Sequence, residues 1–542
     1  MNINQKKLSH TLEVFTTKIH EITLNNPSLF PALFSDLNAL NDPETDRFKE
    51  CYAYMLAQIE TNFIAKAEVQ KNSNLSNYLE EWFQPLTSSF VLKAVHPNNG
   101  LFKTNTLNEN TLFYLNESSV DNKIFCNNLP IVLQPIEIVN SYFDKNGKNF
   151  SAFLEVKALA DIENLNLLKI YFDCNKFSYF YRFLDELLLT QKKIKITYID
   201  KTYESSEDRN ILKYSFSNIF DLSIHKNNNY SFYIHQFVNY LNNYSFIDID
   251  LSMFKMNLKA NETLTIEIPL SKTLPEFQDL NHFAHLNCFP VKNVFRKQGD
   301  PLFFKKGKKG YFTLDRGSKK KFIGIDHIQF FDRNHNDVEM KEGIDYKIHK
   351  KYIVQDKKLD IIYYLKIKTA FANDTIVVPY FKCSNLTEVH SIPLYSKFSI
   401  KNDSSLKFEN ITSASKTTFH FENFSNEFFY NDIFQMNEAI MNSKFYIKKF
   451  FDILEKFSST SSNYKGIMPK IIEQVLIHNE KNIKKYDLQI YKTILTNRYE
   501  VDIKINKQIY KFGGVSLMIH FIDEFLKKVS YSGFQHKIKI KN

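Results

Sequence analysis

Glycine is scarce in this chain, at 12 of 542 residues, which is about a third of the usual ~7%. A backbone that approaches a phosphate group closely normally needs clustered glycines, because a side chain would block the approach. The sequence contains no G-x-G-x-x-G, no G-x-x-x-x-G-K-[ST] and no G-x-S-x-G pattern. These patterns would mark a phosphate-binding loop or a catalytic serine. We therefore expect a protein without enzyme activity and without a cofactor.

Cysteine is also sparse, and its residues are isolated from one another. They are Cys51, Cys126, Cys174, Cys288 and Cys383. An odd number of cysteines without a C-x-x-C pair argues against a disulfide framework and favours a reducing compartment. The first residues are not followed by an apolar stretch, and no run approaches the ~18 apolar residues of a membrane span. We expect a cytoplasmic protein that does not itself insert into a membrane.

Basic charge is moderate and spread along the chain, with a formal net charge of +10. The local clusters, at 192–193, 305–309, 319–321 and 350–351, are lysine rather than arginine. A nucleic-acid groove would place arginine among the lysines, because arginine makes the bidentate contacts to bases. Lysine clusters also protect strand edges from unwanted pairing and keep a protein soluble. We expect solvated loops and strand edges here, and no nucleic-acid partner.

Residues 1–95 are predicted to be helical. The clearest helix begins at Asp42-Pro43, where Asp suits the N-cap and Pro the first helical position. Apolar residues at helical spacing form one stripe on it: Phe48, Tyr52, Met55, Ile59 and Phe63. Tyr54 and Leu56 widen the apolar surface beyond that stripe. A helix that is apolar on more than one side is usually buried on more than one side. It therefore lies either at the centre of a bundle or against a partner protein.

The rest of the chain alternates short strand patterns with a few helices. Residues 96–280 predict a first β-rich domain of mostly antiparallel strands, interrupted by one helix at 180–189. Residues 281–430 predict a second β-rich domain, which the chain enters through a connector at 281–301. Residues 431–542 predict helices followed by a strand, helix, strand unit. The predicted fold class is multidomain α+β: an N-terminal helical bundle segment, two largely antiparallel β-rich domains and a C-terminal α/β unit.

The connector from Asn281 to Pro301 holds the best candidates for metal ligands. His282, His285 and Cys288 lie three residues apart, so on a helix they could face one way and offer three ligands to zinc. A zinc site would also need a fourth ligand or an open water position, and no later residue stands out for that role. The alternative is that Cys288 is a core residue and that the histidines are incidental. A metal-dependent enzyme or effector using this cluster is the competing hypothesis to a structural protein.

Several short stretches along the chain, taken together and in order, carry a resemblance to a known family. They are Asp42-Pro43 with Asp46-Arg47 and 52–59; Tyr78-Leu79 with Pro85; 168–172 with 184–188; 287–295 with Asp300-Pro301; 323–328; and 498–501 with 512–517, Phe525-Leu526 and Phe534. In this order they are similar to motifs of the TssF family (ImpG/VasA-like), baseplate wedge subunits of the bacterial type VI secretion system. The acidic segment that the family carries after the first of these helices is missing here. The chain therefore resembles a divergent member.

The connector carries the best match to the family. Its matching residues are Asn287, Cys288, Pro290, Val291, Asn293, Phe295, Asp300 and Pro301. With this resemblance, the connector is interpreted as a structural signature at a junction between two halves of a scaffold. Pro290 is expected to fix the entry, and the burial of Val291, Val294 and Phe295 to anchor the segment. A turn is expected at Gly299-Asp300-Pro301.

The resemblance implies a structural role in a large assembly, without catalysis or a cofactor. A TssF-like wedge contains a second copy of the chain and a TssG-like subunit, with the N-terminal helices in a shared bundle. The apolar stripe from Phe48 to Phe63 is therefore the expected partner interface. Further implied partners are a TssK-like adaptor, a TssE-like subunit and a VgrG-like spike hub, around which the wedges support assembly of a contractile sheath. The implied location is cytoplasmic, with the inner-membrane secretion complex reached through partners.

Overall fold

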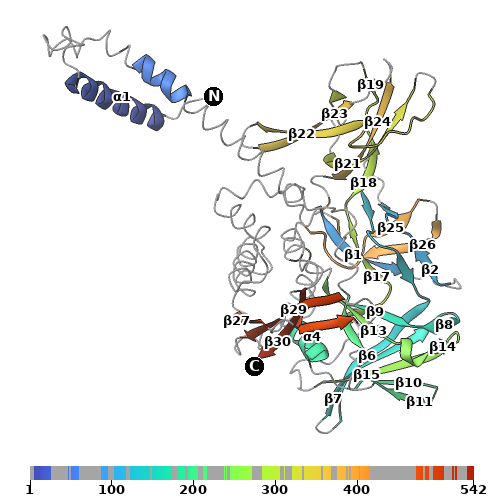
Figure 1. The fold of residues 1–542 in the computed structure, drawn as a ribbon. Coiled ribbons are helices and arrows are strands. Elements are labelled where there is room, and N and C mark those ends of the chain that lie inside the picture. The colour runs from blue at the N-terminus through green and yellow to red at the C-terminus, as the bar shows by residue number, and fades with distance from the viewer. Residues whose placement is uncertain are drawn as a thin grey trace. The chain divides into compact units, whose positions relative to one another are not determined.

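The structure is a computed structural model (Figure 1). It describes residues 5–25, 47, 50–59, 87–95, 103–116, 123–146, 149–173, 180–189, 193–199, 201–205, 211–215, 237, 240, 244–270, 283–304, 310–311, 320–332, 335–355, 358–367, 375–385, 389, 392–401, 403–415, 472–479, 483–487, 492–505, 516–517, 519–521 and 534–541. The chain divides into two compact units. The first comprises Met1–Glu80 with Ile348–Tyr364, and the second comprises Glu81–Lys347 with Leu365–Asn542.

The first unit contains the helices predicted near the N-terminus. Helix α1 spans Gln5–Asn25, and residue 47 and residues 50–59 are also helical. Most of strand β22 (Tyr346–Gln355) and of its neighbour β23 (Lys358–Ile367) belongs to this unit as well. Within the described part of the chain, no helix combines the length and the apolar character needed to cross a membrane.

The second unit contains a closed barrel. Its strands, in order around the barrel, are β1 (Ser89–Val95), β17 (Cys288–Lys292), β4 (Ile124–Cys126), β3 (Leu112–Leu115), β25 (Lys397–Ile400) and β26 (Asp403–Asn410). The barrel closes because β1 pairs on one edge with β17 and on the other with β26, so that Leu92 lies opposite both Phe289 and Asn410. Residues far apart in sequence therefore share one sheet (Figure 1).

Phenylalanine fills the barrel. Alternate residues of each strand point to the same face, and the inward positions include Phe90, Phe113, Phe125, Phe289, Phe398 and Phe408. Their rings meet at angles, with centroids 4.5 Å apart between Phe90 and Phe125 and 5.1 Å apart between Phe113 and Phe408. Edge-to-face contacts of this kind add to the gain from burial. The opposite face of β1 is also covered, because Val91 belongs to a second buried cluster with Tyr171 and Phe246.

Two larger sheets belong to the region predicted as the first β-rich domain. One has the order β11 (Lys201–Glu204), β10 (Lys195–Tyr198), β15 (Thr263–Leu270), β7 (Asn149–Ala158) and β6 (Ile136–Asn146). The other has the order β12 (Leu212–Tyr214), β13 (Phe246–Asp250), β9 (Leu167–Phe172) and β16 (Ala284–His285). Helix α4 (Phe180–Leu189) connects them, because the Phe183 ring contacts both Phe143 on β6 and Phe172 on β9.

Smaller elements complete this region. Strand β14 (Met256–Leu258) pairs with β8 (Ile162–Leu165), strand β2 (Asn105–Leu107) pairs with β5 (Ile131–Leu133), and a short helix η5 spans Ser252–Phe254. A further sheet follows the barrel strand β17 along the chain. It has the order β18 (Phe295–Gln298), β24 (Thr375–Asn385), β19 (Leu302–Phe304), with β21 (Lys320–Phe331) also paired to β24. Strand β20 spans Gly310–Tyr311.

The C-terminal sheet contains a parallel pair. Its order is β27 (Ile472–Asn479), β29 (Lys492–Ile505), β28 (Ile483–Asp487), and β30 (Phe534–Lys541) runs parallel to β29. Residues 516, 517 and 519–521, which lie between β29 and β30 in sequence, are helical. Parallel neighbours require a crossover of this sort. The strand, helix, strand order agrees with the order predicted from the sequence.

The observed fold is mostly β, in several sheets, as the sequence predicted. Among the described strand pairs whose register is known, only β29 and β30 run parallel. Helix α4 has the bounds that were predicted for it. The segments 75–83 and 431–458, which belong to the regions predicted to contain helices, lie outside the described residues. The predicted domain boundaries and the N-terminal bundle remain predictions. The helical prediction is wrong at the end of the segment 1–95, because 89–95 form strand β1.

Candidate functional site

The stretch predicted as a connector consists of strands in its described part. It contains β16, the barrel strand β17 and β18. Strand β17 is fixed on both sides, by pairing with β1 and β4 and by the Ser89 hydroxyl, which donates to the carbonyl oxygen of Val291 at 2.8 Å. Because Phe289 and Val291 both point into the barrel core, the segment is part of a hydrophobic core rather than a link between two cores.

Asn287 sets the start of β17. Its φ of 54° lies in the left-handed region, which asparagine tolerates better than most residues. Its side-chain oxygen accepts the main-chain N–H of Gln134, and its amide donates to the Gln134 carbonyl, both at 2.9 Å. One side chain thus exchanges two hydrogen bonds with a main chain, as a neighbouring strand would. This exchange joins the signature segment to the end of β5.

Asn293 connects the end of β17 to two other sheet elements. It is fully buried, and its amide donates to the Ile124 carbonyl at 2.7 Å and to the Asn385 side-chain oxygen at 3.0 Å. Its own oxygen accepts the Ser384 hydroxyl and the Asn385 main-chain N–H, each at 2.7 Å. Because the buried Asn293 amide forms all of these bonds, it stabilises the observed positions of β4, β17 and β24 relative to one another.

Phe295 and Gly299 attach the second half of the signature to β24. Phe295 is buried and lies opposite Cys383. The Gly299 N–H donates to the Pro379 carbonyl at 2.8 Å. A Cβ at Gly299 would lie 2.1 Å from the Phe381 ring, so the glycine is needed for close approach. The signature residues Asp300 and Pro301 follow it and are exposed.

The proposed metal ligands do not form a helical cluster. His282 lies outside the described residues, His285 is in β16 opposite Tyr171, and Cys288 begins β17. The helical spacing that we expected is therefore wrong for the described part. Burial raises the pKa of the Cys288 thiol, as for a cysteine packed in an apolar core. In the part of the chain that the structure describes, no three His, Cys, Asp or Glu side chains are grouped as a metal would require.

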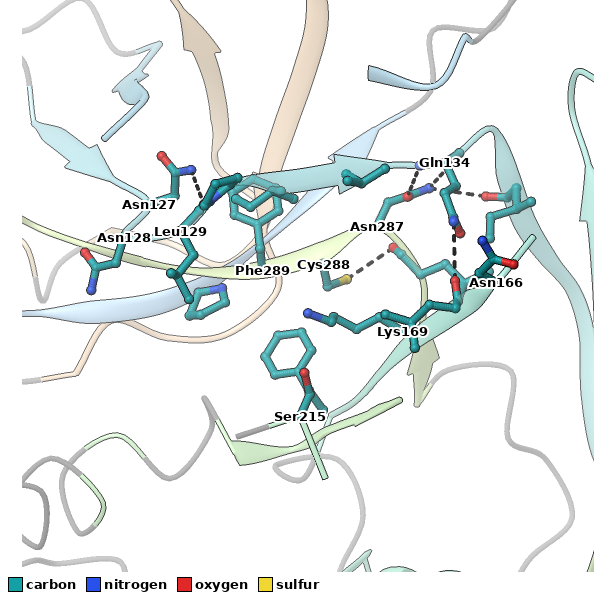
Figure 2. Close-up of a pocket in the computed structure, with 18 of the residues that line it drawn as sticks. Asn127, Asn128, Leu129, Gln134, Asn166, Lys169, Ser215, Asn287, Cys288 and Phe289 are labelled. Atoms are coloured by element: carbon teal, nitrogen blue, oxygen red, sulfur yellow. Dashed lines mark hydrogen bonds between the residues drawn. The ribbon is translucent and has the colours of Figure 1, made fainter. Parts of the chain in front are cut away.

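A cavity of about 410 Å³ lies beside β17 (Figure 2). We call it the signature cavity. Its described lining comes from 127–136 without Leu133 and Pro135, from Asn164, Asn166, Leu167 and Lys169, from Ser215 and Phe246, and from 286–290 with Lys292. This volume is in the range of pockets that hold a small ligand or a peptide side chain. The only charged side chains in this described lining are Lys169 and Lys292.

Lys169 and Asp248 lie directly opposite each other on β9 and β13. Burial lowers the pKa of Lys169, and the attraction of Asp248 opposes this shift. Burial likewise raises the pKa of Asp248, against the effects of Lys169 and of a hydrogen bond from Ser215. Desolvation therefore outweighs the mutual attraction for both groups. Figure 2 shows the Lys169 side chain directed into the signature cavity.

Sequence reasoning missed this cavity. The sequence gives only a weak indication of the cavity, which is the single lysine in the apolar strand pattern Leu168-Lys169-Ile170. Half-buried strands often carry a lysine on their exposed face, so Lys169 alone does not predict a cavity. The cavity walls come from segments that meet only because the barrel and the sheet of β9 and β13 pack together. Cys288, which the sequence had singled out as a ligand, is instead part of an apolar wall.

The predicted partner interface on the helix at 50–59 presents large apolar side chains to solvent. Tyr52, Met55 and Ile59 are exposed, and the exposed fraction of Ile59 is 64%. The small residues Ala53 and Ala57 of the same helix are fully buried. Phe48 and Phe63, the other two stripe residues, lie outside the described residues. The described helix therefore buries its small residues and exposes its large apolar ones.

No family model matches the chain, and no curated protein matches its sequence. Among solved structures, the chain is similar to a chain of the type VI secretion system TssK-TssF-TssG baseplate subcomplex, determined by cryo-electron microscopy. The TM-score is 0.70 at 11% identity, covering 91% of this chain and 96% of the other. The fold is that of a type VI baseplate subunit. A second match, to the type VI secretion baseplate complex, has a TM-score of 0.55 at 12% identity and covers 99% and 96% of the two chains.

Stretches that carried the resemblance contact one another in this TssF-like fold. The Asp185 carboxylate, from the 184–188 stretch, accepts the main-chain N–H of Ser516 at 2.7 Å and its hydroxyl at 2.6 Å. Asp326, from the 323–328 stretch, forms an ion pair at 2.8 Å with Arg296, which follows the signature residue Phe295. Motifs separated in sequence thus meet in the fold, which gives them a shared structural role.

Proposed function

We propose that this chain is a structural wedge component of a type VI secretion baseplate and that it binds a TssG-like subunit through its N-terminal helices. Two observations support the proposal. The TssF-like fold extends over 91% of the chain. The helix at 50–59 exposes Tyr52, Met55 and Ile59, three of the five residues that the resemblance implies as an interface. The exposed apolar helix face is the observation that carries the proposal, because a similar fold alone does not define a binding surface.

The physical argument concerns the cost of the exposed face. Each square ångström of apolar surface left in water costs about 25 cal/mol relative to burial. Tyr52, Met55 and Ile59 lie at i, i+3 and i+7, which places them along one side of the helix. Large apolar residues at this spacing are typical of a helix that docks into a groove or joins a partner's bundle. Ala53 and Ala57 of the same helix are fully buried.

The proposal extends to the rest of the assembly. The solved chain that this chain resembles belongs to a subcomplex of TssK, TssF and TssG. We therefore propose a TssK-like and a TssG-like partner. A second copy of this chain, a TssE-like subunit and a VgrG-like spike hub are the further partners we propose. In this role the chain supports assembly of a contractile sheath and delivery of effectors, without chemistry of its own. It works in the cytoplasm and reaches the inner-membrane secretion complex through its partners.

Co-purification with the TssG-like subunit tests the helix interface. The double change Met55→Asp and Ile59→Asp places two charges on the exposed face and should abolish co-purification while the chain stays folded. Ile344→Asp is the matched control, because Ile344 is exposed to a similar extent, 68% against 64% for Ile59. It should leave the complex intact. A complex that survives the double change with its full stoichiometry would show that this face is not the interface.

A further inference from the structure

We propose that the signature cavity and its rim bind an extended acidic peptide segment of a partner protein. The inference goes beyond the proposed helix interface, because it uses a surface in the second unit and a different kind of contact. Three features carry it: the charge of the cavity, a strand edge beside it that pairs with no described strand, and exposed apolar residues on its rim.

The charge of the cavity favours an anionic occupant. Lys169 and Lys292 are the charged residues of the described lining, and no carboxylate is among those lining residues. Asp248 lies opposite Lys169 within the sheet but outside the lining. A carboxylate brought in by a peptide would therefore meet only positive charge on the described walls. Attraction between opposite charges is stronger in a partly desolvated cavity than in water.

Strand β5 provides an edge for a peptide. In the described part of the chain, β5 pairs with β2 alone, in a two-stranded sheet. Ile131 and Val132 of β5 line the signature cavity. At Gln134, just after β5, Asn287 already imitates a neighbouring strand with its two hydrogen bonds. An extended peptide that adds to such an edge gains main-chain hydrogen bonds, while alternate side chains enter the cavity.

The rim extends the apolar surface beyond the cavity. Val132 and Leu167 both line the cavity and are both exposed, with an exposed fraction of 56% for Val132. A small molecule held inside the cavity would leave these side chains in water. A peptide that runs across the mouth would cover them, and burial of apolar area there would contribute to binding. The rim therefore favours a peptide over a small carboxylate.

The arrangement also defines the sequence that the peptide should have. In an extended chain, residues two positions apart point to the same side. An acidic residue directed at Lys169 and an aliphatic residue directed at the apolar wall near Phe246 and Phe289 should therefore be separated by one residue. The intervening side chains would point to solvent and could be of any polar type.

Selection from a phage-displayed library of random heptapeptides, with the full-length protein as bait, tests the inference. Peptides from the enriched pool are then titrated calorimetrically. We expect enrichment of an acidic residue and an aliphatic residue at i and i+2. Lys169→Met and Val132→Asp should each weaken binding by at least about tenfold, because one removes the counter-charge and the other repels the peptide.

Matched controls separate binding effects from folding effects. Lys213→Met removes a lysine that also lies opposite Asp248, but on β12 and outside the described cavity lining. Val139→Asp changes a valine exposed to 55%, nearly as much as Val132, on strand β6 away from that lining. Both controls should bind the peptides as the unchanged protein does. Since Val132 is exposed, Val132→Asp remains informative even if Lys169→Met disturbs the sheet.

Three results would overturn the inference. The enriched peptides could lack the acidic residue, they could bind Lys169→Met and Val132→Asp undiminished, or octanoate could bind in a Lys169-dependent manner while no peptide does. The last result would assign the cavity to a small amphipathic carboxylate. The Met55→Asp and Ile59→Asp variant should retain peptide binding, so failure of the helix interface and failure of the cavity are distinguished.

Discussion

At Gly299 the main chain passes so close to an aromatic ring that no side chain fits between them. The nearest atom of the Phe381 ring would lie 2.1 Å from an added Cβ, and this ring is buried. The contact holds the end of the signature segment against β24, where the Gly299 N–H donates to the Pro379 carbonyl. A glycine in a chain with so few of them therefore serves a packing need.

Gly299→Ala should lower the free energy of unfolding of this region by about 1–3 kcal/mol, because the buried Phe381 ring must move to admit the methyl group. Gly324→Ala is the control, since nothing lies within 4 Å of an added Cβ there. The change Phe381→Leu should restore much of the loss when combined with Gly299→Ala. Thermal unfolding of the unchanged protein, of Gly299→Ala, of Phe381→Leu and of the double variant measures the coupling between the two positions. Additive losses in the double variant would contradict the packing explanation.

The roles of Asn287 and Asn293 show where prediction from sequence stops at the residue scale. Both were named as parts of a signature, but their partners could not be named. The Asn287 side chain bonds to Gln134, 153 residues earlier, and Asn293 bonds to Ile124, 169 residues earlier. A single sequence contains local spacing, which predicts strands and turns, and contains no record of which distant main chain an amide will meet.

Among the elements, helix α4 and the helical residues near the C-terminus are joined by one buried carboxylate. Asp185 accepts both the main-chain N–H and the hydroxyl of Ser516, and the Tyr214 hydroxyl lies 3.2 Å from the Ser516 oxygen. A hydrogen bond to a charged carboxylate is stronger than one between neutral groups, so Asp185 binds the Ser516 N–H firmly.

Asp185→Ala should leave the buried Ser516 N–H without an acceptor, at a cost of about 1–3 kcal/mol. Amide hydrogen exchange of residues 516–521 should therefore become faster, by about tenfold for each 1.4 kcal/mol lost. Ser516→Ala removes the hydroxyl with its bonds to Asp185 and Tyr214 but keeps the main-chain bond to Asp185, so it should have a smaller effect. Glu163→Ala, which changes an exposed carboxylate, should alter nothing. Unchanged exchange at 516–521 in Asp185→Ala would show that the bond does not hold these residues.

Strand positions were predictable where one face of a strand is buried. Strand β15 alternates between buried and less buried residues along most of its length, and its apolar residues repeat with the same period, which marks a strand in the sequence. The signature cavity was not predictable in this way. Its walls depend on the pairing of β9 with β13 and on the packing of β17 above them, and neither leaves a periodic pattern.

At the scale of the whole molecule, the barrel joins segments that the sequence analysis assigned to different domains. Its strands come from 89–126, from 288–292 and from 397–410. These segments lie on both sides of the boundary predicted near residue 280. Strands β3, β4, β25 and β26 fall in regions predicted to be β-rich, whereas β1 lies in the segment predicted to be helical and β17 in the predicted connector. The pairs that close the barrel join segments far apart along the chain, where local sequence carries no information. The barrel implies that the three segments are stable only together.

Hydrogen exchange of the barrel strands tests this implication. Phe408→Leu removes part of a fully buried ring from the core and should cost about 1–3 kcal/mol. If the barrel opens as one cooperative unit, the amides of β1, β3, β17 and β26 should lose protection by the same free energy. Leu154→Ala changes a buried residue of β7 and should instead affect the five-stranded sheet first. If Phe408→Leu loosened only residues 288–292 and 397–410, while 89–126 kept its protection, two independent domains would meet near residue 280 and the barrel would be an interface between them.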